Sequence, residues 1–507
     1  MAVRGETDES QQPDISNRKI FSASALGFLT AATIVTSLRN LPMMAQEEMT
    51  MFFYIGISAL LFLIPAGLVA AELGSAFSDR TGGVYTWVGE AFTPKVGFIA
   101  IWLQWAECVV WYPTELGFAA AAIAYAFGDQ SLAGNTYYIG GFCIVAYLIA
   151  TAVALSGTQF LAEVTKYGFL LGTLMPCVIL IALAIGWVML GHPLGWETAT
   201  DPAVAVREEG QAHPRWFPHI TGLGAVAFLG GILLSFAGIE AQASHVSEMP
   251  NARRGYPIVI GIAALVSFLV FTLGALAISA ILPYKQISIE TGLFTAFNQG
   301  FSQLLGIGWP VQILAGLIAY GALGGALAWL AGPSKGLLAT AQDGMLPPWF
   351  QRENARGVQK NILYTQCLIV LLISSIYVLV DNVSTAFVLI SVMAISLYII
   401  MYLLMFAAVI RLRYTQPDLP RSFKIPGGIT GVWITAGTGI AAVSFALLVS
   451  FFPPQQLTIA DPKTYVALVF TGIVITVSIP LLIFYLRKPS WRQEGGHEQQ
   501  SFSDIDE

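Results

Sequence analysis

A carboxylate stands at the end of a long apolar run near the middle of the chain, within residues 233–250 (LLSFAGIEAQASHVSEMP). Ser235, Gly238 and Ser244 are small or weak helix formers close to Glu240. A charged side chain at the centre of a bilayer costs about 2.5–3.5 kcal/mol, and less near the surface. An interrupted helix exposes backbone groups, which are tolerated only where they line a cavity. The segment therefore predicts a site that binds the charged ends of a small solute.

A structural explanation of the same residues stays open. Gly238 would then allow close packing of two helices, and Glu240 would be hydrogen-bonded to a neighbouring helix. Both explanations require the segment to lie inside a membrane.

The composition places it there. The chain has 507 residues, of which 56% are hydrophobic and 11% charged, whereas soluble proteins carry roughly 25% charged residues. A bilayer core needs about 20 helical residues. Twelve apolar runs reach that length, near 20–42, 51–73, 94–127, 137–160, 165–190, 220–244, 257–282, 310–341, 361–380, 384–410, 430–453 and 464–486. We expect an all-α polytopic membrane protein with 12 transmembrane helices, as one domain over 20–486 between cytoplasmic tails 1–19 and 487–507.

The basic residues predict the orientation. With the N-terminus inside, only five of the 24 lie outside, and the other 19 face the cytoplasm; the five are Arg39, Arg207, Arg215, Lys285 and Lys463. Loops rich in Lys and Arg stay cytoplasmic. Both termini are therefore expected inside.

Several classes of function are not supported. We find no HExxH, GxSxG, P-loop or GxGxxG motif in a suitable context, so an enzyme is not expected. The cysteines Cys108, Cys143, Cys177 and Cys367 fall in apolar runs and form no CxxC pair, which indicates buried free thiols. No cofactor, no metal site and no nucleic-acid partner are predicted.

Three sequence blocks resemble a known family. They are SFAGIE followed by HVSEMPNARRGYP, then LAGPSKGLLATAQDGMLPPWF, and AELGSAFSDRTGGVYTWVGEAF. They are similar to the amino acid–polyamine–organocation (APC) superfamily, and to its glutamate/GABA antiporter subfamily, over about residues 20–486.

The resemblance implies two inverted repeats, helices 1–5 and 6–10, followed by two C-terminal helices. Helices 1 and 6 would be unwound at mid-membrane with the substrate between them. The stretch corresponding to the helix 1 break, residues 30–34, contains no glycine. Trp329 would close over the substrate and Glu240 would gate or couple transport; the remaining substrate-binding residues would be Ala31, Ala32, Thr33, Ser235, Phe236, Ala237 and Gly238.

Further charges lie within the predicted spans. Arg39 is near the outer end of the first, while Glu107 and Glu115 are eight residues apart in the third and so share roughly one helical face. An Arg–Glu pair between these helices would offset the burial cost of both groups, either as a structural pair or as an outer gate. Among the nearby aromatic residues, Tyr112 is the candidate for a gating role.

We therefore expect a secondary transporter in a bacterial inner membrane that works by alternating access and exchanges an amino acid for its decarboxylated amine, with glutamate and GABA as the best single pair. A proton-coupled symporter of the same fold and a non-transporting amino acid sensor remain alternatives. The expected partners are amino acid and amine substrates and membrane lipid, with a homodimer as a candidate assembly.

Overall fold

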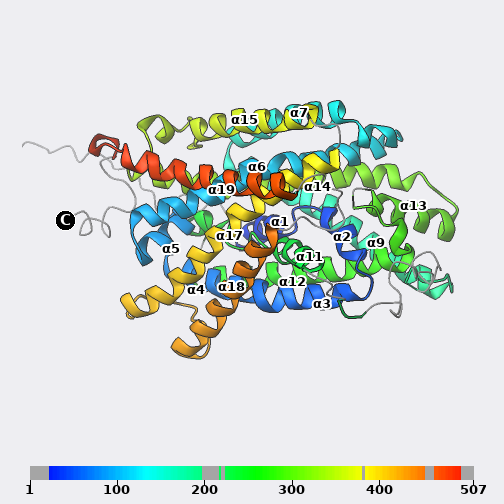
Figure 1. Cartoon of the computed structure of the whole chain (residues 1–507), viewed down its shortest axis with the longest axis horizontal. Helices are drawn as coiled ribbons and strands as arrows, with labels where there is room; N and C mark the ends of the chain where they lie inside the picture. Colours follow the sequence, from blue (N-terminus) through cyan, green and yellow to red (C-terminus); the bar gives the residue numbers. More distant parts are fainter. Residues whose placement is uncertain are drawn as a thin grey trace, which may run out of the picture.

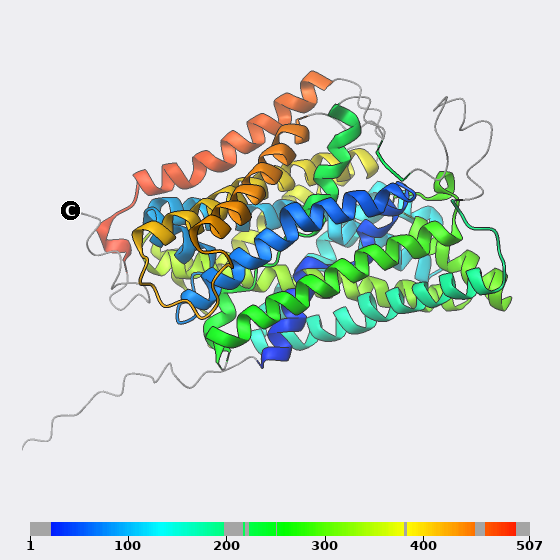
Figure 2. The same ribbon diagram turned by 90° about the horizontal axis from the view of Figure 1, so that it is seen from below.

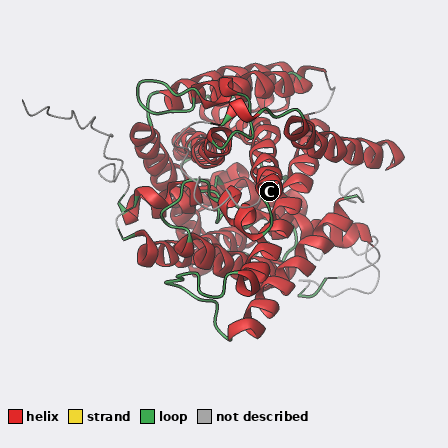
Figure 3. Cartoon of the chain, turned by 90° about the vertical axis from the view of Figure 1, so that its left-hand side faces the viewer, coloured by secondary structure: helices red, strands yellow, loops and turns green. Residues whose placement is uncertain are grey.

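The computed structural model describes residues 22–196, 216–218, 223–249, 251–289, 291–379, 383–451 and 462–492. Within these ranges the chain forms helices and connecting loops but no strand (Figure 3). The predicted tail 1–19 and most of the tail 487–507 lie outside the described residues.

The first half of the chain begins with an interrupted helix. It contains α1 (Ala23–Ile34), η2 (Leu38–Asn40), α2 (Leu41–Ala45), α3 (Thr50–Ser58), η3 (Ala59–Leu63), α4 (Ile64–Ala76), α5 (Val84–Ala91), α6 (Pro94–Ala126), η4 (Gln130–Gly134), α7 (Thr136–Leu155), α8 (Thr158–Tyr167), η5 (Gly168–Leu174) and α9 (Met175–Met189).

The second half also begins with an interrupted helix. It contains α11 (Leu223–Ser235), η6 (Ala243–Glu248), α12 (Ala252–Ile281), η7 (Tyr284–Gln286), α13 (Gly292–Leu305), α14 (Pro310–Gln342), η8 (Pro348–Gln351), α15 (Lys360–Ser374), α16 (Ile376–Leu379), α17 (Val383–Thr415), α18 (Gly428–Ser450), α19 (Pro462–Tyr485) and η9 (Pro489–Trp491).

Seven helices in the described ranges are long and apolar enough to cross a membrane, and two shorter apolar helices, Lys360–Ser374 and Val469–Tyr485, accompany them. These helices confirm the all-α polytopic fold. The count of 12 spans stays a prediction. All four cysteines are free and buried, as expected.

Local sequence sets where several helices begin. The Thr93 side chain accepts a hydrogen bond from the Val96 N–H, and Pro94 follows in the first turn of α6, where its missing N–H is not needed. The side chain of Asn135 caps α7 in the same way. The cap and the proline define the start of α6, which extends for 33 residues. Helix α14 has the same length.

The interrupted helices lie inside the bundle. Figure 1 shows α1 and α11 near its centre, with α7 and α15 side by side along one edge. The most extensive packing in the structure joins α6 to α14 and to α17, while α1 packs on α12, α14 and α8. The view from below shows the same long helices running roughly along one common direction (Figure 2). Helix α14 thus links α1 to the packed helices α6 and α17, while α11 packs on α18 and α3.

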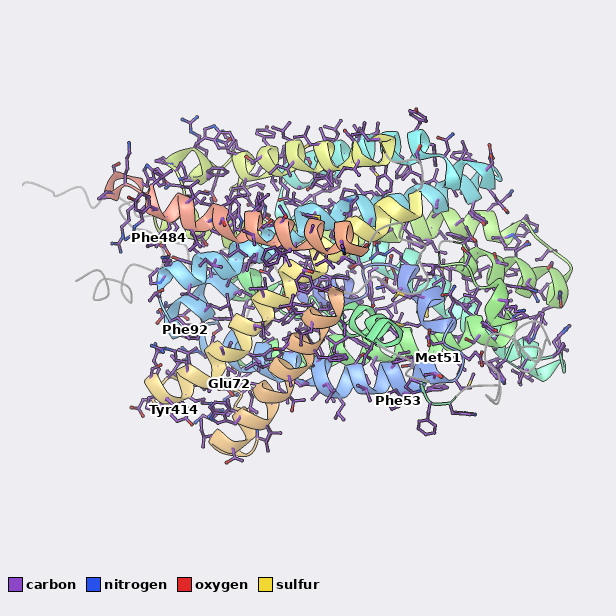
Figure 4. All side chains as sticks on the ribbon, in the orientation of Figure 1. Met51, Phe53, Glu72, Phe92, Tyr414 and Phe484 are labelled. Atoms are coloured by element: carbon purple, nitrogen blue, oxygen red, sulfur yellow. The ribbon has the colours of Figure 1, made fainter. Side chains whose placement is uncertain are left out.

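A buried ionic network fixes one end of this scaffold. The Glu72 carboxylate on α4 accepts two hydrogen bonds of 2.7 Å from the Arg413 guanidinium on α17, and a third of 2.7 Å from the Ile425 N–H. Arg421 lies 3.2 Å from the same carboxylate and also donates to the carbonyls of Leu412 and Gln416. Figure 4 labels Glu72, close to the end of α17. The loop after α17 is therefore held at both ends of its basic segment.

Candidate functional site

The first helix is interrupted one turn later than predicted. Residues 30–34 are α-helical, and the helix stops at Ile34. Residues 35–37 form the break, and Ser37, in an extended conformation, begins η2. The prediction placed the break on 30–34 because the family pattern was aligned there without a glycine to mark it. Ala31, Ala32 and Thr33 are therefore buried residues of the last helical turn, not residues of the break itself.

The sixth predicted span is interrupted where Gly238 indicated. Helix α11 ends at Ser235, and residues 236–242 are non-helical before η6 begins. Gly238 has a φ of +109°, a conformation that residues with a Cβ rarely adopt. Its Cβ, if present, would also lie 2.8 Å from the Thr33 carbonyl oxygen. Glu240 lies within this break.

The residues on either side of the first break contact the second break and the end of α11. The Thr33 hydroxyl donates to the Gly238 carbonyl oxygen over 3.0 Å, and the Asn40 side-chain amide donates to the Ser235 hydroxyl over 3.1 Å. The N–H groups of Thr36 and Ile239 form no backbone hydrogen bond with the described part of the chain. Polar backbone groups of two helices therefore meet in the interior of the bundle, where a charged solute could use them.

Helix α14 closes one side of this region. The Trp329 indole N–H lies 2.9 Å from the Thr33 carbonyl oxygen and 3.1 Å from the Thr36 hydroxyl. One turn to each side, Gly325 and Gly332 let the α14 backbone approach: an added Cβ would lie 2.3 Å from the Thr36 carbonyl oxygen and 2.0 Å from the Ala241 carbonyl oxygen. The structure thus brings Trp329 to both breaks, and its closing over the substrate stays a prediction.

Glu240 is surrounded by donors from two other helices. Its carboxylate accepts hydrogen bonds from the Gln104 side-chain amide at 2.9 Å, from the Tyr402 hydroxyl at 2.5 Å, and from the Tyr398 hydroxyl. The Tyr402 hydroxyl in turn accepts from the Gly238 N–H at 2.9 Å. Glu240 is 1% exposed, so these bonds are what compensates its removal from water.

An ion pair and an aromatic ring lie beside Trp329. The predicted pair of Arg39 with Glu115 is confirmed, at 3.5 Å between Nε and Oε2. Arg39 also donates to the Thr114 hydroxyl at 2.9 Å and lies over the Trp111 ring, whose centroid is 6.0 Å from that of Trp329. The pair therefore connects α6 to the segment just after the first break.

Two predicted site residues point elsewhere. The Tyr112 ring packs 4.9 Å from that of Tyr147 on α7, and its hydroxyl has no hydrogen-bond partner in the described ranges. The Phe236 ring packs edge-on against Phe271 of α12 at 5.2 Å. These contacts place neither ring against Trp329 or Glu240, and the gating role of Tyr112 stays a prediction.

An ionic cluster links the far end of the sixth segment to α14. The His245 Nδ1 lies 2.9 Å from Glu248, and the Lys335 ammonium donates to the same carboxylate. Burial alone would raise the pKa of Glu248, but His245 and Lys335 lower it to about 2. Glu248 is therefore ionised, and the cluster holds η6 on α14.

The comparisons with known proteins agree with this arrangement. The family model described as "Amino acid permease" matches residues 20–478. The chain belongs to the amino acid permease family. It is a multi-pass membrane transporter of amino acids and not an enzyme.

The permease resembles several bacterial transporters along most of its length. An uncharacterized transporter of Legionella pneumophila is 34% identical, covering 92% of this chain and 97% of the relative. The glutamate/gamma-aminobutyrate antiporter of Lactococcus lactis subsp. cremoris is 28% identical, covering 93% and 91%. A "probable agmatine/putrescine antiporter" of Lactococcus lactis subsp. lactis is 23% identical, covering 83% and 86%.

Sequence reasoning missed the permease residues that surround Glu240. Gln104 precedes it by 136 positions, and Tyr398 and Tyr402 follow it by 158 and 162. The spacing of four residues between the two tyrosines on an apolar helix predicts one shared face. It does not indicate which helix that face meets.

Proposed function

We propose that the permease exchanges an amino acid for its decarboxylated amine by alternating access, with glutamate and GABA as the exchange pair. The observation that carries this proposal is the contact of the end of α1, just before the first break, with the second break, closed on one side by Trp329. The substrate would bind there, with its carboxylate near free N–H groups of the breaks. The exchange activity named for the glutamate/gamma-aminobutyrate antiporters of Lactococcus lactis supports the choice of substrates.

In this proposal the first ten spans form two inverted repeats of five, and the last two lie outside them. Both termini face the cytoplasm of a bacterium, as the basic residues indicate. A cysteine introduced at Ala203 should be labelled from outside in whole cells, and one at Arg356 should not. Labelling in the reverse pattern would invert the orientation.

Radiolabelled exchange in proteoliposomes tests the activity. Vesicles loaded with labelled GABA should release it only when glutamate or another substrate is present outside. Release that needs no external substrate, or uptake driven by a pH gradient alone, would replace exchange with symport. Saturable binding without any flux would instead make the protein a sensor.

A further inference from the structure

One face of α6 is directed at the two breaks. Gln104, Glu107, Trp111 and Thr114 are spaced at i, i+3, i+7 and i+10, which places them along one side of a helix. Three of them have partners there: Gln104 bonds to Glu240, the Trp111 ring lies beside Trp329, and Thr114 accepts from Arg39. The fourth, Glu107, stands between them.

The neighbouring faces of α6 are occupied by other helices. The Trp105 indole N–H donates to the Gln366 side chain of α15 at 2.9 Å. Tyr112 packs on Tyr147 of α7. Since residues 105 and 112 lie on the sides facing α15 and α7, the side chain at 107 is left facing the sixth segment and α14.

Glu107 is the member of this face with an oxygen atom that has no partner in the described ranges. Its side chain is 7% exposed, and its Oε2 has no hydrogen-bond partner within the described ranges. Unpartnered buried carboxylate oxygens are costly and therefore rare. The nearby Cys108 thiol donates to the Gln104 carbonyl oxygen, 3.0 Å away. Glu107 thus presents one unpartnered oxygen, Oε2, toward the region between the breaks.

The surrounding charges make this acceptor selective. Glu240, another carboxylate, is bonded to Gln104 on the preceding turn of the same face. The guanidinium group closest to this face, that of Arg39, is paired with Glu115. Two carboxylates therefore share the face, which favours a cation and disfavours an additional anion.

We propose that the Glu107 carboxylate is the counter-ion for the ammonium group of the substrate. It favours a substrate with more positive charge over one with an extra carboxylate. This inference rests on the proposed function, in which an amino acid and its amine bind between the breaks. It identifies a specificity-determining residue that lies outside both breaks.

Competition against labelled substrate tests the role of Glu107. In proteoliposomes, the inhibition constants of GABA, glutamate and putrescine are measured for wild type, Glu107→Gln and Glu107→Asp. Glu163→Gln, on the exposed face of α8, is the control for loss of a carboxylate. In Glu107→Gln we expect GABA and putrescine to bind about tenfold to a hundredfold more weakly, because a charged hydrogen bond is lost.

The ratio between substrates is the decisive quantity. Glutamate should lose less affinity than GABA in Glu107→Gln, because its additional carboxylate is no longer repelled. Glu107→Asp should keep the wild-type order, and it serves as the folded reference if the glutamine variant does not assemble. Equal losses for all three compounds, or an order changed as much by Glu163→Gln, would overturn the inference.

The two proposals fail in different ways. A wild-type protein that transports putrescine but neither glutamate nor GABA would remove the proposed exchange pair. The Glu107 inference would then still require Glu107→Gln to weaken putrescine. A wild-type protein that binds none of these ammonium compounds would overturn both.

Discussion

Trp329 joins three parts of the site through one indole ring. Its N–H group lies within hydrogen-bond distance of the Thr33 carbonyl at the end of α1, and its ring contacts Trp111 of α6 and Tyr398 of α17. The side chain is 6% exposed, so it fills the space beside the breaks.

At the scale of single residues, the residue types of the site could be predicted from the sequence, because a tryptophan, a glycine and a carboxylate in apolar runs are conspicuous. Their partners could not, because the pairings join helices distant in the chain.

We predict that Trp329→Leu lowers the exchange rate about tenfold or more while membrane insertion is retained. The variant loses a hydrogen bond that contributes about 1 kcal/mol and aromatic contacts of about 0.5–1.5 kcal/mol each. Exchange and the level of protein in the membrane are both measured. Trp309→Leu, an exposed tryptophan at the start of α14, is the control, and equal rates in the two variants would make Trp329 a packing residue only.

The Arg39–Glu115 pair makes a prediction of its own. Arg39→Ala leaves a buried carboxylate without its partner, which costs about 3–5 kcal/mol. The double variant Arg39→Ala with Glu115→Ala should therefore be more stable than the single one. Thermal unfolding in detergent of all four members of the cycle gives the coupling free energy. Additive effects would show that the 3.5 Å contact contributes no coupling.

Among the elements, α14 determines how closely the breaks are covered. Gly325 and Gly332 lie one turn on either side of Trp329 and let the α14 backbone contact both breaks.

The fold class and the second break could be predicted from the sequence, since the length of the apolar runs and a glycine both leave a local signal. The first break could not be located, because 30–37 contains no glycine and its neighbourhood is defined by contacts with the second break and with α14, which are distant in the chain.

Gly332→Ala should separate α14 from the sixth segment. The new methyl group would lie 2.0 Å from the Ala241 carbonyl oxygen, so the helices must move apart. We expect the free energy of unfolding to fall by about 1–3 kcal/mol and exchange to fall with it. Gly261→Ala is the matched control, since nothing lies within 4 Å of its added Cβ. Normal stability and exchange in Gly332→Ala would contradict the close approach of these backbones.

Across the whole molecule, two sets of contacts hold the end of the transporter at which α4, α14 and α17 terminate (Figure 1 and Figure 4). In the first set, Glu72 binds Arg413 and Arg421. Near η9, the Gln351 side-chain amide donates to the Trp491 carbonyl oxygen at 2.6 Å, and Gly344 lies against Arg492. These contacts join the last described residues to the end of α14, beside Asp343.

Asp343 should give this end a dependence on pH. Burial raises the pKa of Asp343 from 3.8 to about 6, although the charges of Arg492 and Arg80 oppose the shift. The folded state therefore binds this proton more tightly than the unfolded state does. The stabilisation of the folded state by the protonated Asp343 is complete below about pH 4. It is lost as the pH rises towards about 6.

The difference in melting temperature between wild type and Asp343→Asn isolates this group. We expect that difference to decrease between about pH 4 and about pH 6, and to be constant above this range. Melting is followed in detergent at constant ionic strength. A difference that is constant from pH 4 to 7, or one that increases with pH, would contradict the burial of the carboxyl group.

The central claim is that the substrate binds between the two helix breaks, and thiol protection tests it most directly. In a background without the four native cysteines, Ser235→Cys introduces a thiol at the end of α11, and Ser131→Cys places a control thiol in an exposed turn. We predict that saturating glutamate or GABA slows modification of Ser235→Cys at least severalfold and leaves Ser131→Cys unchanged. Equal modification rates for Ser235→Cys with and without a substrate that is still transported would contradict the account.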